Sequence, residues 1–244
     1  GLFDHLNKTL HHWEESSDDF LENLGKVYKK LFSRESLVAV ITTEESNLNA
    51  AKEEVKAFIN NLTDTFGERQ EIEVYPKKKN EGITAPYNVQ YVSKGLNFKE
   101  LGYDYTGSMA ALGQYLSTDF LHNEIRAKGG AYGAGIVLER NGDVTTYSYR
   151  DPNLLKTIQT YDKLSEHLEN LSIEQEDLES IIIGTASKFD PLLSASSVGP
   201  YLLTSFLTGL TRETLEKNLE EALGTKVDTL KSFSALFKYL EELN

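Results

Sequence analysis

The segment RAKGGAYGAG, residues 126–135, sets four glycines between a helical pattern and an alternating apolar pattern. Residues 106–127 predict a helix, because their apolar positions recur at helical spacing. The side chains expected to face the core are Met109, Leu112, Leu116, Phe120 and Ile125. The glycines that follow predict a turn, with Gly129 as the C-cap glycine of this helix and Gly130 continuing the turn.

Gly133 and Gly135 need a different explanation, because they stand inside a strand pattern. Glycine weakens a strand and often marks the close approach of another backbone or of a ligand. A small-residue surface packed under a helix is an equally physical cause. The sequence leaves both explanations open.

A β-hairpin is predicted directly after this segment. Asn141-Gly142 separates two alternating stretches, AYGAGIVLER (131–140) and DVTTYSYR (143–150). Asn-Gly between such stretches is a strong signal for a two-residue turn, because both turn residues must tolerate positive φ. Asp151-Pro152-Asn153 should then end the second strand and begin a helix that runs to about Leu171.

The remaining pattern indicates an α+β fold, with an antiparallel sheet and helices packed on one side of it. The stretch YNVQYVSKG (87–95) alternates weakly and is interpreted as a strand. Further helices are expected near 173–189, 195–208, 211–223 and 225–242.

Residues 1–75 predict a helix, a strand and a second helix. Ser16 or Ser17 can cap the first helix, whose apolar side chains from Phe20 to Leu31 recur at helical spacing. SLVAVITT (36–43) is β-branched and almost continuously apolar, which is typical of a strand covered on both faces. Residues 44–66 return to a helical pattern.

A change of composition divides the chain. YPKKKNEGITAP (75–86) contains two prolines, a glycine and three consecutive lysines, and is interpreted as a linker between domains. We therefore predict a first part at 1–75, a linker at 76–86 and a domain at 87–244.

Composition excludes several classes of function. The 244 residues carry a formal net charge of −13, with 38 acidic and 25 basic side chains, which argues against a nucleic-acid partner. The chain has no cysteine, so disulfides and thiolate metal sites are excluded. No apolar run approaches the roughly 20 residues of a membrane span, and the N-terminus lacks the pattern of a signal peptide. A cytoplasmic, bacterial protein is expected, and the missing initiator Met suggests a fragment or a processed product.

Catalytic motifs are weak in this sequence. HHWEE (11–15) nearly reproduces the H-x-x-E-H zinc helix: His11 and Glu14 fit, but Glu15 stands where the second histidine should be. There is no nucleophile elbow, and His122 is interpreted as a polar residue on a helix face. Phosphate loops precede a helix, whereas the glycine segment follows one.

Two motifs in the right order carry a family resemblance. NEIRAKGGAYGAG (123–135) followed by TYSYRDPN (146–153) resembles the C-terminal half of insulinase-family zinc metallopeptidases, in particular the presequence-protease-like group. The resemblance covers about 87–244, and residues 1–75 look like the helix-strand-helix tail of the preceding domain. It implies a metallohydrolase domain of the insulinase and processing-peptidase type, the last of four related α+β domains.

The resemblance also implies a function. The last domain of the family holds no metal. It reaches across a closed chamber with an arginine and a tyrosine that contact the substrate. By motif match these residues are Arg126 and Tyr132, with Gly129 and Gly130 forming the supporting turn. Zinc belongs to the first domain of the parent enzyme, so this portion is predicted to bind no zinc, to have no catalytic residue and to be an inactive part of a peptide-bond hydrolase. Its expected partners are unstructured peptides and the N-terminal catalytic half of the same protein, without nucleic acid or membrane.

Two alternatives remain. The chain could be an inert insulinase-like structural or partner subunit, which would lack H-x-x-E-H in the parent sequence. A stand-alone peptide-binding module would require a natural full-length product, against which the missing Met argues.

Overall fold

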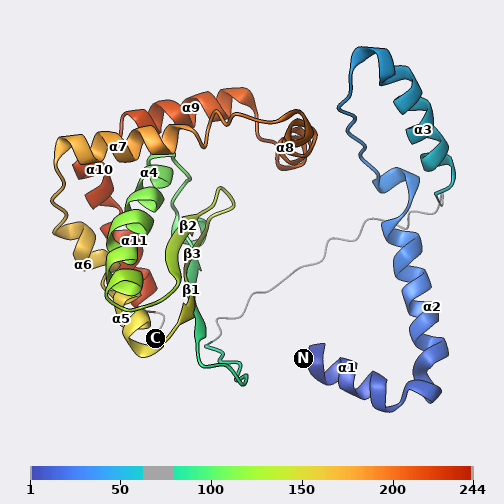
Figure 1. Cartoon of the computed structure of the whole chain (residues 1–244), viewed down its shortest axis with the longest axis horizontal. Helices are drawn as coiled ribbons and strands as arrows, with labels where there is room; N and C mark the ends of the chain where they lie inside the picture. The colour runs from blue at the N-terminus through green and yellow to red at the C-terminus, as the bar shows by residue number, and fades with distance from the viewer. Residues whose placement is uncertain (1, 63–79, 243–244) are drawn as a thin grey trace. The chain divides into compact units, whose positions relative to one another are not determined.

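The structure is a computed structural model that describes residues 2–62 and 80–242 (Figure 1). Contacts between residues divide the chain into two compact units. The first comprises residues 1–77 and 193–208, and the second comprises residues 78–192 and 209–244. The predicted end of the second helix, near residue 66, and residues 76–79 of the predicted linker lie outside the described residues. Residues 80–86 of the linker carry neither helix nor strand.

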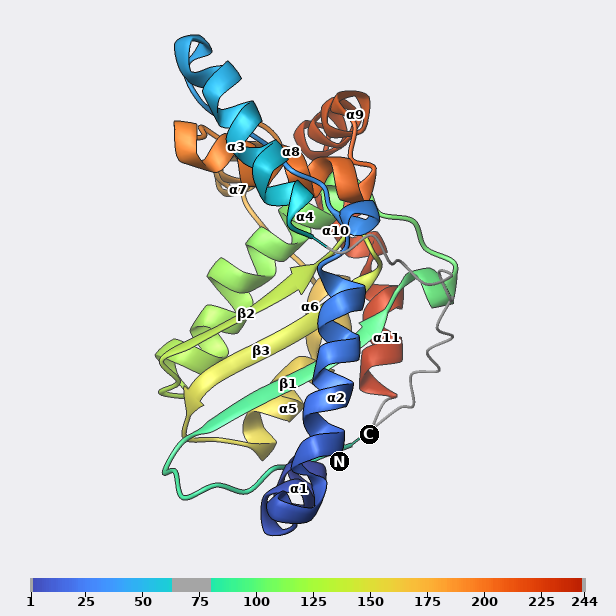
Figure 2. The ribbon, with the colours of Figure 1, turned by 90° about the vertical axis from the view of Figure 1, so that its right-hand side faces the viewer.

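The second unit is built on a three-stranded antiparallel sheet with strand order β1-β3-β2 (Figure 2). Its strands are β1 Gln90–Asn97, β2 Gly133–Leu138 and β3 Asp143–Asp151. β2 and β3 pair directly with each other, so the predicted hairpin is confirmed.

The hairpin turn is longer than predicted. β2 ends at Leu138 and β3 begins at Asp143, so four residues connect them. The Gly142 N–H donates to the Glu139 carbonyl at 3.0 Å, and Gly142 alone in the turn has a positive φ, of +106°. The two-residue prediction was therefore wrong: the turn closes between Glu139 and Gly142 and needs left-handed backbone at its last residue alone.

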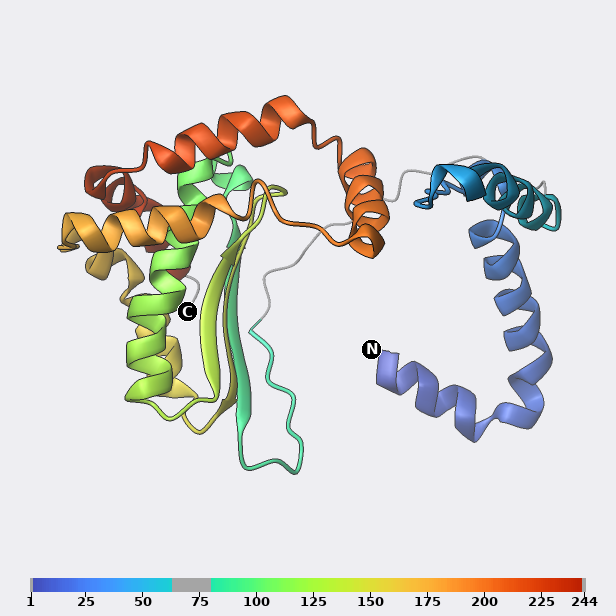
Figure 3. The same cartoon turned by 45° about the horizontal axis from the view of Figure 1, so that its top comes forward.

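Helices cover one face of this sheet (Figure 3). α4 Gly107–Tyr115 contacts β2, while α5 Leu155–Asp162 and α11 Ser234–Glu241 contact β1. η4 Leu116–Phe120 and η5 His122–Ala127 continue α4, and the other helices of the unit are η3 Lys99–Leu101, α6 Leu164–Glu169, α7 Gln175–Ala186, α9 Arg212–Leu223 and α10 Val227–Ser232. The α+β architecture with helices on one side is confirmed.

The predicted core face of the helix at 106–127 is correct in four positions of five. Met109, Leu112, Leu116 and Ile125 are buried, whereas Phe120 is half-buried and stacks on His167 with ring centroids 4.0 Å apart. These side chains pack against Ile136, Leu138 and Val144 of the hairpin, together with Leu236, Phe237 and Leu240 of α11. The glycine segment therefore connects the central helix of the core to a sheet edge.

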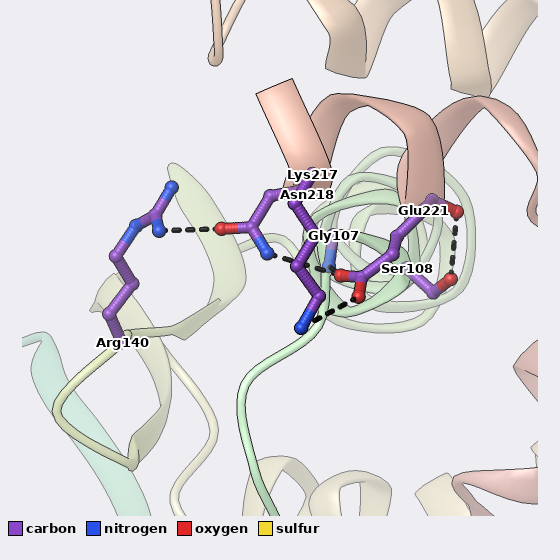
Figure 4. A network of polar contacts seen from close by, with 6 residues as sticks. All are labelled: Gly107, Ser108, Arg140, Lys217, Asn218 and Glu221. Carbon is purple, nitrogen blue, oxygen red and sulfur yellow. Dashed lines mark hydrogen bonds and ion pairs between the residues drawn. The ribbon is translucent and has the colours of Figure 1, made fainter. Parts of the chain in front are cut away.

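A polar network joins α9 to the beginning of α4 (Figure 4). The Gly107 backbone N–H donates to Glu221 Oε2 at 2.7 Å, and Asn218 Nδ2 donates to the same oxygen at 3.1 Å. Arg140 Nη1 in turn donates to Asn218 Oδ1 at 2.5 Å. Glu221 thus satisfies an otherwise unpaired N–H at the α4 N-terminus, as a capping side chain does, and its charge suits the positive end of the helix dipole.

The first unit contains four α-helices among its described residues. They are α1 Leu2–His11, α2 Trp13–Leu31, α3 Leu48–Asn60 and α8 Ala195–Thr208, with short 3₁₀ turns η1 Arg34–Ser36 and η2 Glu45–Asn47. α2 begins at Trp13, before the predicted caps at Ser16 and Ser17. The Ser16 hydroxyl donates back to the His12 carbonyl at 2.8 Å and so lies inside the helix.

The segment SLVAVITT is not a strand. Residues 37–44 have no strand partner among the described residues, and they run without regular secondary structure. Val40 and Thr42 pack against α8 instead: a β-carbon at Gly199 would lie 2.8 Å from Thr42 Oγ1 and 3.7 Å from Val40 Cγ1. β-Branched residues favour an extended backbone, but a strand also requires a neighbouring strand with which to pair.

Candidate functional site

The site begins where the central helix of the second unit ends. After α4 the chain winds into two π-helical segments, η4 Leu116–Phe120 and η5 His122–Ala127, and Arg126 lies in the last turn of η5. π-Helical turns inside α-helices are frequent at functional sites. Arg126 is exposed at this end of the helix.

The glycine turn reverses the chain at Gly130, not at the predicted Gly129. Gly130 has φ +82°, its N–H donates to the Arg126 carbonyl at 2.9 Å, and the Ala131 N–H donates to the Ile125 carbonyl at 3.1 Å. These paired bonds with a left-handed glycine are typical of a helix C-terminus. Position 129 requires glycine for a steric reason, because a β-carbon there would lie 2.4 Å from the Ile125 carbonyl oxygen.

The turn brings Arg126 and Tyr132 to one open pocket of about 710 Å³. Tyr132 stands immediately before β2, where its N–H donates to the Tyr149 carbonyl at 3.2 Å and 61% of the residue is exposed. The pocket is lined by His122, Arg126, Ala127, Gly130, Ala131, Tyr132 and Arg150. Three of these side chains can donate hydrogen bonds from nitrogen and one from a phenol, so the pocket suits an oxygen-rich group such as a peptide carbonyl or a carboxylate.

Gly133 and Gly135 make room for tyrosine rings. A β-carbon at Gly133 would lie 2.3 Å from Tyr149 Cε1, and one at Gly135 would lie 2.6 Å from Tyr147 Oη. Each tyrosine is the direct cross-strand partner of its glycine in the hairpin. Of the two explanations that the sequence left open, a small-residue surface under a helix does not apply, because the tyrosine rings lie on the sheet face opposite the helices. Aromatic side chains cover strand glycines in this way in other sheets.

A buried carboxylate anchors the far side of the site. Asp151 Oδ2 accepts hydrogen bonds from the hydroxyls of Ser148 and Thr157, both at 2.7 Å, and Oδ1 accepts the Asn153 backbone N–H at 2.8 Å. The Asn153 side chain donates in turn to the Gly129 carbonyl at 2.6 Å. The end of β3 is therefore hydrogen-bonded to the glycine turn, and this bond helps to fix the turn that positions Arg126 and Tyr132.

Two pocket residues were not singled out by the sequence analysis as members of a site. His122, interpreted as a polar helix-face residue, lines the pocket one helical turn before Arg126. Arg150 lines it from β3, with its guanidinium carbon 5.5 Å from the centroid of the Tyr132 ring. Strand alternation gives no signal for Arg150, because it places position 150 on the covered face together with Ser148.

The HHWEE segment is divided between two helices. His11 ends α1, and Glu14 and Glu15 lie in the first turn of α2. On the surface, His12 Nδ1 lies 3.6 Å from Glu15 Oε2. Within residues 2–62 and 80–242, no three His, Asp or Glu side chains are grouped in a way that could hold a metal ion. The same residues include no helix that is both long and apolar enough to cross a bilayer.

Comparison with known proteins decides the family. A family model described as the PreP C-terminal domain matches residues 80–241. The chain belongs to this family. Over 227 residues it is 34% identical to Protein HypA of Clostridium perfringens, and over 237 residues it is 31% identical to presequence protease 1, chloroplastic/mitochondrial, of Arabidopsis thaliana. These alignments cover 93% and 92% of the chain but 23% and 21% of the two relatives, so the chain spans about a fifth to a quarter of their length.

A solved structure supports the fold of this PreP C-terminal domain. The peptidase M16 inactive domain from Pseudomonas fluorescens superposes with a TM-score of 0.53 at 15% identity, covering 79% of this chain and 48% of that one. The resemblance of the glycine segment to the presequence-protease-like group of the insulinase family is confirmed by the family model and by these relatives.

Proposed function

We propose that this chain is the C-terminal, zinc-free portion of a zinc-dependent oligopeptidase, and that it helps to close a peptide chamber and contacts the substrate through Arg126 and Tyr132. Unstructured peptides and the N-terminal catalytic half of the same protein are its proposed partners. A bacterial, cytoplasmic location is part of the proposal, supported for the source by the identity to the Clostridium perfringens protein.

One observation carries the proposal: Arg126 and Tyr132, six positions apart and on opposite sides of a turn, line the same open pocket. A guanidinium and a phenol can both donate to a peptide carbonyl, or to the oxyanion that it becomes during hydrolysis. Within the described residues Arg126 forms no ion pair, and Tyr132 is largely exposed although its ring contacts Tyr149 and Arg150. In contrast, Lys128 in the same helical end pairs with Glu124.

Zinc does not fit the described residues of this chain. They offer no three-donor group, and a structural or catalytic zinc needs three or four protein ligands. In this proposal the ligands and the general base belong to the part of the longer protein outside this chain. What this chain supplies is hydrogen-bond donation from the two side chains named above.

The test uses the longer protein and a short fluorogenic peptide. We expect Arg126→Ala and Tyr132→Phe each to lower kcat/KM by about 10²–10³, the usual effect of removing one oxyanion donor, with zinc content and melting temperature unchanged. Matched controls are Lys128→Ala, in the same helical end, and Tyr239→Phe, on α11. A helix-end arginine with a structural role alone would contribute ~0.3–1 kcal/mol to stability and leave turnover as in the wild type.

Wild-type turnover in both variants would refute the proposal. Absence of an H-x-x-E-H helix and of zinc from the longer protein would favour the alternative, an inert insulinase-like structural or partner subunit.

A further inference from the structure

Arg150 occupies an irregular position in β3. Tyr91 of β1 pairs with Tyr149, but the next pair joins Gln90 to Asp151, so Arg150 has no opposite residue and forms a β-bulge. Its φ is +47°, and no other residue except glycine has a positive φ in the described part of the chain. Bulges are common beside active sites, where they redirect a side chain.

The bulge changes the sheet face on which Arg150 lies. Along β3 the side chains alternate regularly up to Tyr149, with Ser148 buried under the helices and Tyr149 on the open face. Without the extra residue Arg150 would face the covered side. With it, Arg150 stays on the open face beside Tyr149, and Asp151 reaches its buried hydrogen bonds to Ser148 and Thr157.

The strained backbone needs a reason, because a residue with a β-carbon is disfavoured in the left-handed region. Glycine is the usual residue at such a bulge position. Arg150 stacks over Tyr132, but an attraction between an exposed cation and a ring is weaker than the usual cost of left-handed backbone. Folding alone therefore does not account for an arginine at this position, and strain of this kind clusters at functional sites.

The charges around the pocket indicate what Arg150 binds. His122, Arg126 and Arg150 line it, and no Asp or Glu does, although the whole chain carries a net charge of −13. No ion pair to Arg126 or Arg150 is formed within the described residues. A guanidinium fork matches a carboxylate with two parallel hydrogen bonds, and arginine is preferred over lysine for this reason.

We infer that Arg150 is a third substrate-binding residue of this pocket, and that with Arg126 it binds a carboxylate of the peptide, either the C-terminal α-carboxylate or an acidic side chain. The inference rests on the proposed function, since it places peptide in the pocket. Stacking on Tyr132 would also hold that ring in position for its own contact.

The experiment compares Arg150 variants of the longer protein on two matched pairs of fluorogenic peptides. One pair differs in its C-terminus, a free acid against an amide, and the other differs in one residue near the cleaved bond, Glu against Gln. The wild type should cleave the carboxylate member of at least one pair with the higher kcat/KM. In Arg150→Gln the ratio of kcat/KM for the carboxylate peptide to that for its neutral partner should fall about 10- to 100-fold, the usual effect of losing a charge-assisted hydrogen bond. The same ratio in Arg150→Lys should lie between those of the wild type and of Arg150→Gln.

Arg150→Gly supplies a readout that a structural role would not give. Glycine removes the guanidinium and also the backbone strain, so this variant should melt at the same or a higher temperature. It should still lose the preference in kcat/KM for the carboxylate peptide over its neutral partner. Loss of the ratio for the C-terminal pair assigns the α-carboxylate, and loss for the Glu/Gln pair assigns an acidic side chain; either supports the inference.

Two outcomes would overturn it: no carboxylate preference in the wild type, or a wild-type ratio in Arg150→Gln. The failure of this inference is distinguishable from that of the proposed function. Arg126→Ala and Tyr132→Phe would then still lower turnover of every peptide, whereas normal turnover in those two variants would refute the proposed function itself.

Discussion

The two units of this chain have similar sequence patterns and different interiors. In the second unit, eight of the nine residues of α4 are buried. In the first unit, α1, α2 and α3 bury no residue, although all three have an apolar stripe. Leu21, Leu24 and Leu31 of α2 are between 54% and 66% exposed. The contrast shows that an amphipathic stripe predicts a helix but not its burial, which requires a facing sheet or a second helix.

The strongest test of the comparison is the same substitution in both units. Leu112→Ala in α4 removes a fully buried side chain and should cost about 2–5 kcal/mol. Leu24→Ala in α2 removes a side chain that is 54% exposed, so it should cost less than half as much. Urea unfolding followed by far-UV circular dichroism measures both, and fluorescence of Trp13, the single tryptophan, follows the first unit. Equal costs would break the comparison.

Glycine-to-alanine substitutions should have opposite effects on the stability of the two units. A β-carbon at Gly107 would lie 1.7 Å from the Asn218 backbone oxygen, so Gly107→Ala should destabilise by about 1–3 kcal/mol or more. Nothing lies within 4 Å of a β-carbon at Gly25 in α2, and Gly25→Ala should stabilise the first unit by about 0.5–1 kcal/mol. Thermal melts of both variants decide this, and destabilisation by Gly25→Ala would show that α2 is packed more closely than described.

The network of Figure 4 gives the second unit an acid-sensitive contact. Burial raises the pKa of Glu221, but hydrogen bonds from Gly107 and Asn218 and the charge of Lys217 outweigh it and hold the pKa below its usual value. The unfolded chain therefore binds the proton more tightly, so the contribution of Glu221 is present above the unfolded pKa and is lost as the pH falls through the folded pKa.

Glu221→Ala should cost about 0.5–2 kcal/mol at pH 7, as for the loss of a helix cap, and less in acid. Glu220→Ala, an exposed neighbour on α9, is the matched control. Urea midpoints at pH 7 and pH 3 measure the difference, and an equal cost at both values would exclude a role for the charge.

The smallest effect is expected at His167. Burial lowers its pKa, and its Nε2 lies 2.7 Å from the hydroxyl of Tyr115, whose own pKa burial raises to about 12. Protonation is easier in the unfolded chain, so the second unit should lose stability as the pH falls from 7 toward 5. His167→Gln should flatten that dependence of the melting temperature, whereas His11→Gln, on the surface of the first unit, should leave it as in the wild type.

Local sequence signals determined most elements of the second unit. The helix at 106–127, the hairpin and the helices after Pro152 follow from hydrophobic period, from glycine and from Asn-Gly, each of which acts within a few residues. Arg126 and Tyr132 were identified through the resemblance of the glycine segment to a peptidase family, and the structure adds that one turn brings both to the same pocket. Their role in binding peptide stays a prediction.

Tertiary structure decided the features that depend on distant partners. SLVAVITT has the composition of a strand, but within residues 2–62 and 80–242 it pairs with no strand, and Val40 and Thr42 pack beside α8 instead. Gly133 and Gly135 are explained by the rings of Tyr149 and Tyr147, which lie 16 and 12 positions along the chain and meet them only through the hairpin register. Arg150 is the clearest case: a bulge opposite β1 and a buried Asp151 place it on the open face, and strand alternation alone predicts the other face. Local sequence determines backbone conformation, whereas pairing and burial between distant residues determine which side chains meet.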